Sequence, residues 1–242
     1  LILKKIQKNL VNDAIFLELS KEVYVKLEAW KTLKDLIPKL EKHKVINSDE
    51  IEKIRLRIFM EELYASWRDG ISENEKGIHP GLKKLWKKAP LKFRSNEKVV
   101  YHYADLLIRS GAKADAARAL ETAISKVWSD FLVSYYSKQD FNTGPRQLLT
   151  AEKWLKKRPA DATLLLVLGR ISMRNKLWEK ARDYYEHSIK ISPSAEAYVE
   201  LSRLLKYLDE IEASELCLRN YFNFIGAQLP DLPLPGENEI TH

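Results

Sequence analysis

Cysteine is almost absent from this chain, since Cys217 is the only one among 242 residues. A single cysteine excludes a disulfide framework within the chain. No histidine lies close to Cys217 in the sequence, so nothing there indicates a reactive thiol. We expect Cys217 to be a small buried residue in the last helix, and a reducing compartment is allowed.

Glycine and proline are also scarce, with 8 and 9 residues, and most fall at breaks such as Asn142–Pro145. No segment shows sustained apolar–polar alternation between hairpin turns, which argues against a β-sheet. Helix starts are marked near Asn47, Asn96 and Ser194, and Gly111 has the place of a glycine that ends a helix. The sequence therefore predicts an all-α protein.

Long apolar runs are missing too. The longest, 163–168, is far below the ~18 residues of a transmembrane helix, and no signal peptide is visible. The chain begins with Leu1 rather than methionine, within what looks like a helix. We therefore expect it to be a fragment, and a membrane anchor before residue 1 is compatible with the sequence.

Catalytic and metal-binding motifs are absent as well. The sequence has no phosphate-binding loop, dinucleotide fingerprint or nucleophile elbow. None of the five histidines lies at metal-ligand spacing from another ligand. We predict a protein that is not an enzyme and has no cofactor. Haem ligation by His187 or Cys217 is a minor alternative.

What the sequence does contain is a repeat between Asp161 and Pro193, in which large, small and aromatic residues follow a fixed order. Counted from Ala162, the pattern places Leu165, Leu168, Gly169, Ala181, Tyr185, Ser188 and Pro193 at positions 4, 7, 8, 20, 24, 27 and 32. This is the order of a tetratricopeptide (TPR) repeat, a helix-turn-helix unit of about 34 residues. Small residues let the two helices approach, Tyr185 fills the space beside them, and Pro193 ends the second helix.

Weaker copies flank this repeat. Small residues twelve positions apart recur at Ala104/Ala116 and Ser202/Ser214. Less regular helix pairs are expected at Ser129–Ser137 with Gln147–Arg158, and at Leu17–Lys26 with Trp30–Lys42. Since one repeat cannot bury its own apolar face, we predict one TPR-like superhelical solenoid of roughly a dozen antiparallel helices over residues 1–229. Its repeats are degenerate in 1–95 and clearer in 97–226, and a disordered Pro-rich acidic tail is expected at 230–242.

A basic window lies between Lys76 and Lys98, with Trp86 and Phe93 among its cations. The simplest interpretation is a solvated face of a connecting helix. Attraction to an anionic membrane is the next, and nucleic acid is the least favoured because no nucleic-acid-binding motif is present. The predicted membrane-facing residues are Lys83, Lys84, Trp86, Lys87 and Lys88.

The chain also resembles a known family. The segments Ala151–Leu155, Pro159–Asp161, Leu164–Arg170 and Leu177–Arg182 are together similar to the HemY family of proteobacterial TPR proteins. The resemblance covers most of 17–225. It implies an inner-membrane protein with two N-terminal transmembrane helices and a TPR body, and an association with the late, protoporphyrin and haem steps of tetrapyrrole biosynthesis. We expect the TPR body on the cytoplasmic face of the membrane. It implies no catalytic residues.

In TPR proteins the first helices of the repeats line a concave face, which implies a binding surface here. Its predicted residues are Tyr101, Arg109, Arg170, Met173, Arg174, Arg203, Lys206 and Tyr207. This mostly basic groove favours an acidic or C-terminal peptide segment with an apolar anchor. Alternatively, these arginines pair with carboxylates of adjacent helices and bind nothing.

Three functions follow as hypotheses. The favoured one is a non-catalytic scaffold that binds a protein partner, such as a haem-pathway enzyme, at the bacterial inner membrane. The second is a porphyrin- or haem-binding carrier module. The third is a general membrane-assembly adaptor unrelated to haem. The oligomeric state is not predicted.

Overall fold

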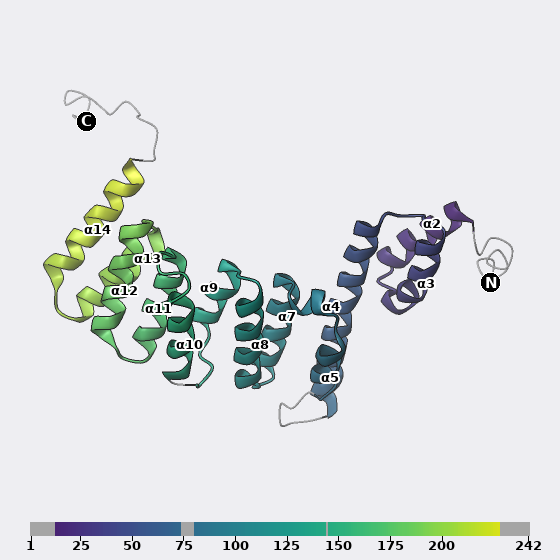
Figure 1. Cartoon of the computed structure of the whole chain (residues 1–242), viewed down its shortest axis with the longest axis horizontal. Coiled ribbons are helices and arrows are strands. Elements are labelled where there is room, and N and C mark those ends of the chain that lie inside the picture. The colour runs from purple at the N-terminus through teal and green to yellow at the C-terminus, as the bar shows by residue number, and fades with distance from the viewer. Residues whose placement is uncertain (1–12, 74–79, 144, 228–242) are drawn as a thin grey trace, which may run out of the picture. The chain divides into compact units, whose positions relative to one another are not determined.

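The computed structural model describes residues 13–73, 80–143 and 145–227 (Figure 1). These residues form thirteen α-helices, α2 to α14, and no strand, which confirms the all-α prediction for this part of the chain. The chain divides into two compact units, residues 1–128 and 129–242, and each is described on its own below. The expected tail at 230–242 lies outside the described residues.

The described part of unit 1 begins with a helical hairpin of α2 (Ala14–Lys26) and α3 (Trp30–Lys42). Helix α3 has the predicted bounds. Asp13 caps α2, because its carboxylate accepts a hydrogen bond from the backbone N–H of Phe16 at 3.0 Å. Leu33 and Leu40 of α3 are fully buried, so the pair packs through its apolar faces.

Helix α4 (Ser48–Glu73) has 26 residues, about twice the length of a helix in a 34-residue repeat. It starts where predicted, because the Asn47 side chain accepts from the backbone N–H of Glu50 at 2.8 Å. Two side-chain hydrogen bonds join α4 to the later part of the unit. Tyr64 lies 2.6 Å from Nδ1 of His102, and Trp67 donates to Ser110 at 3.0 Å.

The remainder of unit 1 comprises α5 (Pro80–Lys88), the short α6 (Leu91–Arg94), α7 (Glu97–Arg109) and α8 (Lys113–Lys126). The predicted small pair Ala104 and Ala116 is fully buried, and α7 packs against α8. Gly111 follows α7 with φ +74°, a left-handed conformation that suits the glycine expected to end this helix.

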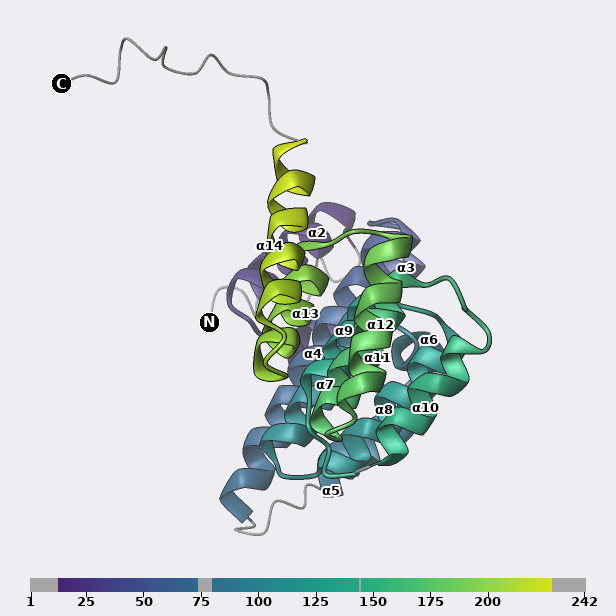
Figure 2. The ribbon, with the colours of Figure 1, turned by 90° about the vertical axis from the view of Figure 1, so that its left-hand side faces the viewer.

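Unit 2 contains three consecutive helix pairs. They are α9 (Asp130–Lys138) with α10 (Pro145–Leu155), α11 (Ala162–Arg174) with α12 (Trp178–Ile191), and α13 (Ala195–Tyr207) with α14 (Ile211–Gly226). Helix α11 contacts α9, α10 and α12, and α13 contacts α12 and α14. Figure 2 shows α12, α13 and α14 beside one another from a second direction.

Helix α10 begins two residues before the predicted Gln147, because Pro145 suits the first helical position. Gln147 itself is buried. Its amide donates to the carbonyl oxygens of Tyr136 at 2.8 Å and Gln139 at 3.2 Å. This side chain therefore satisfies two carbonyls at the end of α9, which water would otherwise have to reach.

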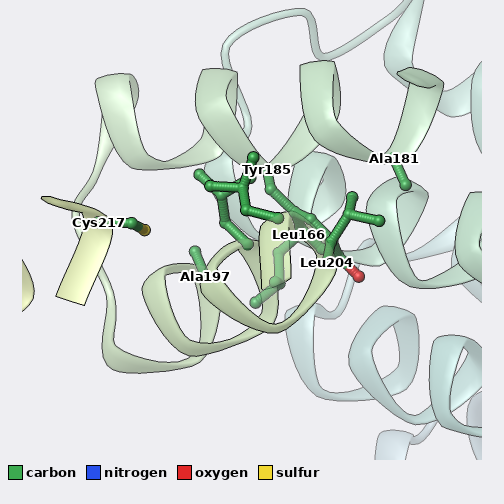
Figure 3. Close-up of a cluster of buried hydrophobic side chains, with 8 residues drawn as sticks. Leu166, Ala181, Tyr185, Ala197, Leu204 and Cys217 are labelled. Atoms are coloured by element: carbon green, nitrogen blue, oxygen red, sulfur yellow. The ribbon is translucent and has the colours of Figure 1, made fainter. Parts of the chain in front are cut away.

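The repeat at 161–193 packs as its spacing predicts. A Cβ atom built on Gly169 would lie 2.3 Å from Cε1 of Tyr185, so the ring occupies the space that glycine leaves. Figure 3 shows Tyr185 in the cluster formed by α11, α12 and α13, with Leu166 and Ala197. Asp161 caps α11 by accepting from the backbone N–H of Leu164 at 2.9 Å, and α12 ends before Pro193.

The Ser202/Ser214 pair also lies at a close helix crossing. The two hydroxyl oxygens are 2.9 Å apart, and Ser214 Oγ donates to the carbonyl oxygen of Ser202 at 2.9 Å. Cys217 is buried on α14 as expected, and its thiol donates to the carbonyl oxygen of Tyr198 at 3.4 Å. Burial raises the pKa of this thiol, which agrees with a structural residue.

Candidate binding surfaces

Arg170, the central cation of the predicted groove, forms ion pairs with two glutamates. Its Nε lies 2.8 Å and its Nη2 2.6 Å from Oε1 of Glu200, and Nη2 also pairs with Glu196. The Arg170 side chain is only 13% exposed. The alternative expected from the sequence, pairing with carboxylates of an adjacent helix, therefore holds for Arg170, because both glutamates belong to α13.

This network reaches the core. Burial, followed by the charge of Glu200, raises the pKa of the Tyr185 phenol. Desolvation lowers the pKa of the Arg170 guanidinium, but the hydrogen bonds that it donates to Glu200 and then to Glu196 raise this pKa overall. Glu200 therefore joins the surface arginine to the aromatic side chain that fills the α11–α12 crossing.

The other predicted residues of α11 serve mainly in packing and capping. Arg174 donates through Nη1 to the carbonyl oxygen of Gln139 at 2.7 Å, and through Nη2 to that of Ser137. It thus binds the end of α9. Met173 packs against the buried cluster of unit 2.

The predicted residues of α13 are different, because they are exposed. Arg203 and Lys206 form no ion pair with any residue that the structure describes. Tyr207 is 80% and Val199 41% exposed. Val199, Arg203, Lys206 and Tyr207 follow helical spacing and share one side of α13. We call these four residues the α13 face.

A recess of about 300 Å³ lies beside this helix. It is lined by Ser134 of α9, by Thr163, Leu166 and Arg170 of α11, and by Ala195 and Glu196 of α13, with serines from the α12–α13 connection. The first helices of three successive pairs thus contribute to one concave surface.

Tyr101 and Arg109, the predicted groove residues of unit 1, both lie on α7. Arg109 pairs with Asp105 one turn earlier, with Nε 2.8 Å from the carboxylate. Tyr101 is half-buried and meets the ring of His102 edge-on, with centroids 5.1 Å apart. Neither side chain is a free cation or an exposed aromatic residue.

The predicted membrane-facing residues lie on α5 but do not form one surface. Lys84, Lys87 and Lys88 are exposed, whereas Lys83 pairs with Asp115 of α8. Trp86 stacks on Tyr103 of α7, with ring centroids 3.9 Å apart and planes at 5°. Its ring is therefore held within unit 1, and the exposed lysines form the basic patch without an aromatic anchor.

Sequence reasoning missed an apolar cavity of about 610 Å³ between α3, α4, α5 and α6. Ile37, Pro38, Ile58, Phe59 and Phe93 are among its apolar lining. The cations on its rim are largely neutralised: Lys34 lies 2.5 Å from Glu62, Arg55 2.8 Å from Glu41, and Lys92 3.0 Å from Glu52. No sequence signal identified it, because its walls come from four separate helices.

His187 and Cys217, the two minor candidates for haem ligation, do not line any of the surfaces described above. His187 lies on the surface, with Nδ1 2.7 Å from the backbone carbonyl of Asp183, and Cys217 belongs to the core cluster of unit 2. Within the described ranges, no group of histidine, cysteine and acidic residues is arranged to hold a metal ion. Over the same ranges, no helix has both the length and the apolar character needed to span a membrane.

No protein-family model matches the chain. No curated protein matches it either. The resemblance to TPR and HemY proteins therefore depends on the residue pattern alone.

Proposed function

We propose that this protein is a non-catalytic TPR-like scaffold, whose second unit binds a protein segment along α11 and α13. The observation that carries the proposal is the α13 face, where two cations that have no ion pair with a described residue lie beside an exposed tyrosine and valine. Exposed aromatic residues and arginine are the types enriched at protein interfaces. The recess lined by α9, α11 and α13 continues this surface.

The chemistry of the α13 face favours a particular partner. Arg203 and Lys206 provide positive charge, while Tyr207 and Val199 provide apolar contact area. A segment that carries carboxylates and one apolar side chain fits both. Arg170 contributes little to this charge, because Glu196 and Glu200 already neutralise it.

The partner proposal has a direct test in the intact protein. We expect Arg203→Glu combined with Lys206→Glu to reduce capture of partners from bacterial membranes about tenfold or more, because two attractive charges become repulsive. The control is Lys153→Glu with Lys157→Glu, which makes the same charge change at exposed positions around the end of α10. Quantitative mass spectrometry of the captured proteins provides the readout. Equal loss in both double variants would show that net charge, and not the α13 face, determines capture.

We further propose a place for this scaffold at the bacterial inner membrane, next to the late haem-pathway enzymes. The support is the HemY-like residue pattern together with the basic patch of α5. A scaffold and a porphyrin carrier are distinguishable by spectroscopy. Titration with haem is expected to give no shifted Soret band for a scaffold, whereas a carrier would give a saturable one.

The basic patch predicts salt-sensitive binding to anionic vesicles, at ~1 kcal/mol for each lysine near the surface. Replacing Lys84, Lys87 and Lys88 by glutamine is expected to abolish this binding at low salt. The control replaces the exposed Lys153, Lys156 and Lys157, which removes the same charge elsewhere. Co-sedimentation with anionic and neutral vesicles measures the difference. Equal binding of the wild-type protein to both vesicle types would contradict a role of the patch.

A further inference from the structure

A second cleft of unit 1 lies on the other side of α5. It has a volume of about 310 Å³ and is bounded by α5, α6, α7 and α8. This volume is at the lower end of the range of roughly 300–1,000 Å³ found for small-molecule sites. Trp86 and Tyr103 form an apolar wall whose two rings are stacked.

The lining of this cleft is strongly basic. Five cations line it against one carboxylate, Asp115, which leaves a net charge of +4; the cations are Lys83, Lys87, Arg94, Arg118 and Lys126. Asp115 is shared, because both Lys83 and Arg118 pair with it. The hydrogen bond from Lys83 holds the pKa of Asp115 below its usual value, so the carboxylate is ionised at neutral pH and fully engaged.

Three cations of the cleft have no counter-charge among the residues that the structure describes. Lys87, Arg94 and Lys126 form no ion pair within the described part of the chain. Arg94 is the most informative of them, because its Nε is buried and has no hydrogen-bond partner there. A buried donor without an acceptor is costly in a folded protein, so the described residues leave this guanidinium, which lines the cleft, incompletely satisfied.

We propose that this cleft binds a phosphate group, with Arg94 as the central ligand and Lys87 and Lys126 at its sides. The planar fork of a guanidinium matches two phosphate oxygens, and a net charge of +4 favours a dianion over a monoanion. The site is separate from the partner-binding α13 face, because its residues all lie in unit 1, but it shares Lys87 with the basic patch of α5. The same phosphate chemistry is available from a soluble phosphate ester and from a phosphomonoester lipid headgroup.

The first experiment titrates the whole chain with inorganic phosphate near neutral pH, against sodium chloride at equal ionic strength. The Nε–H signal of Arg94 and the indole N–H signal of Trp86 are followed by ¹⁵N NMR. We expect both signals to shift and saturate with phosphate but not with chloride. A wild-type protein whose signals respond equally to the two salts would overturn the proposal.

Variants distinguish phosphate binding in the cleft from a general effect of positive charge. Arg94→Lys keeps the charge but loses the fork, and is expected to weaken phosphate binding roughly 10-fold or more. Lys84→Gln removes one exposed charge from the same helix outside the cleft, and is expected to change the affinity by less than about twofold. Lys126→Gln, at an exposed position of α8, replaces Arg94→Lys if that variant does not fold. Equal weakening by Lys126→Gln and Lys84→Gln would contradict the site.

Vesicles distinguish the two sources of phosphate. Neutral phosphatidylcholine vesicles containing phosphatidic acid, a phosphomonoester, are compared with vesicles containing phosphatidylglycerol at equal surface charge. If the wild-type protein prefers phosphatidic acid and Arg94→Lys loses this preference, the ligand is a lipid headgroup. Binding of free phosphate without that preference identifies a soluble phosphate ester.

Discussion

Replacing Gly169 by leucine is expected to lower the free energy of unfolding of unit 2 by ~1–3 kcal/mol. Even the first side-chain atom at this position would lie 2.3 Å from the ring of Tyr185. That ring is 2% exposed and packed among α11, α12 and α13, so it cannot move aside without opening the core. Urea unfolding followed by circular dichroism measures the change, and hydrogen exchange of α11 and α12 locates it.

Gly226 provides the control, because it also lies in a helix and no atom of the described residues is within 4 Å of a Cβ built on it. Gly226→Ala is expected to leave stability unchanged or to raise it by up to ~1 kcal/mol, since alanine favours the helix. Gly169→Leu with unaltered stability would mean that position 169 does not lie at the helix crossing.

The second large effect is expected from Arg170. Arg170→Met removes the shared partner of Glu196 and Glu200 and leaves two like charges beside the core. The hydrogen bonds lost are to charged groups and partly buried, so the expected cost is about 1.5–3 kcal/mol. Arg203→Met is the control, because Arg203 is exposed and has no ion pair among the described residues. Its cost is expected to stay within about 0.5 kcal/mol.

The cost of Arg170→Met is expected to depend on pH. The hydrogen bond from Arg170 lowers the pKa of Glu196. A carboxylate with a lowered folded pKa stabilises the protein above its unfolded pKa of about 4.3, and this contribution is lost as the pH falls through the folded value. The difference in the free energy of unfolding between the wild-type protein and Arg170→Met is therefore expected to be largest at neutral pH and to decrease as the pH falls.

Urea unfolding of both proteins over a pH series measures this dependence, and Glu200→Gln tests the network further. In a double-mutant cycle, Arg170→Met and Glu200→Gln are expected to be non-additive, because they share one interaction. Additive costs, or a difference that grows in acid, would contradict the proposed network. Because Arg170 is paired with Glu196 and Glu200, Arg203 and Lys206 are the better positions for charge reversals that test partner binding.

The positions of the close helix crossings could be predicted from the sequence. Gly169, Ala181 and Tyr185 occur in an order that allows two helices to approach, and this order depends only on local spacing and side-chain size. Ser202 and Ser214 extend the same spacing to the next pair. The caps of α4, α7 and α13, at Asn47, Asn96 and Ser194, were predictable for a similar reason, because capping is a local hydrogen bond between a side chain and a nearby backbone N–H. The bounds of α3 were predicted as well.

The length of α4 could not be predicted, although Asn47 marks its start. A 34-residue repeat implies a break within 48–73, but α4 continues and is joined to α7 through Tyr64 and Trp67. Local propensity marks where a helix can begin. Whether it continues depends on contacts with helices far away in the sequence.

The sequence by itself determined the helical class, the close crossings and the side of each helix on which a cation lies. Only the tertiary structure decided which cations are available. Arg170 is neutralised by two glutamates of α13, Lys83 is paired with Asp115, and Trp86 is stacked on Tyr103. Arg94 forms no ion pair among the described residues, although it and Arg170 each keep one buried nitrogen without a hydrogen-bond partner there. Periodicity fixes the direction of a side chain around its own helix, whereas its charge is neutralised by whichever helix packs against it, and that neighbour is set by the fold.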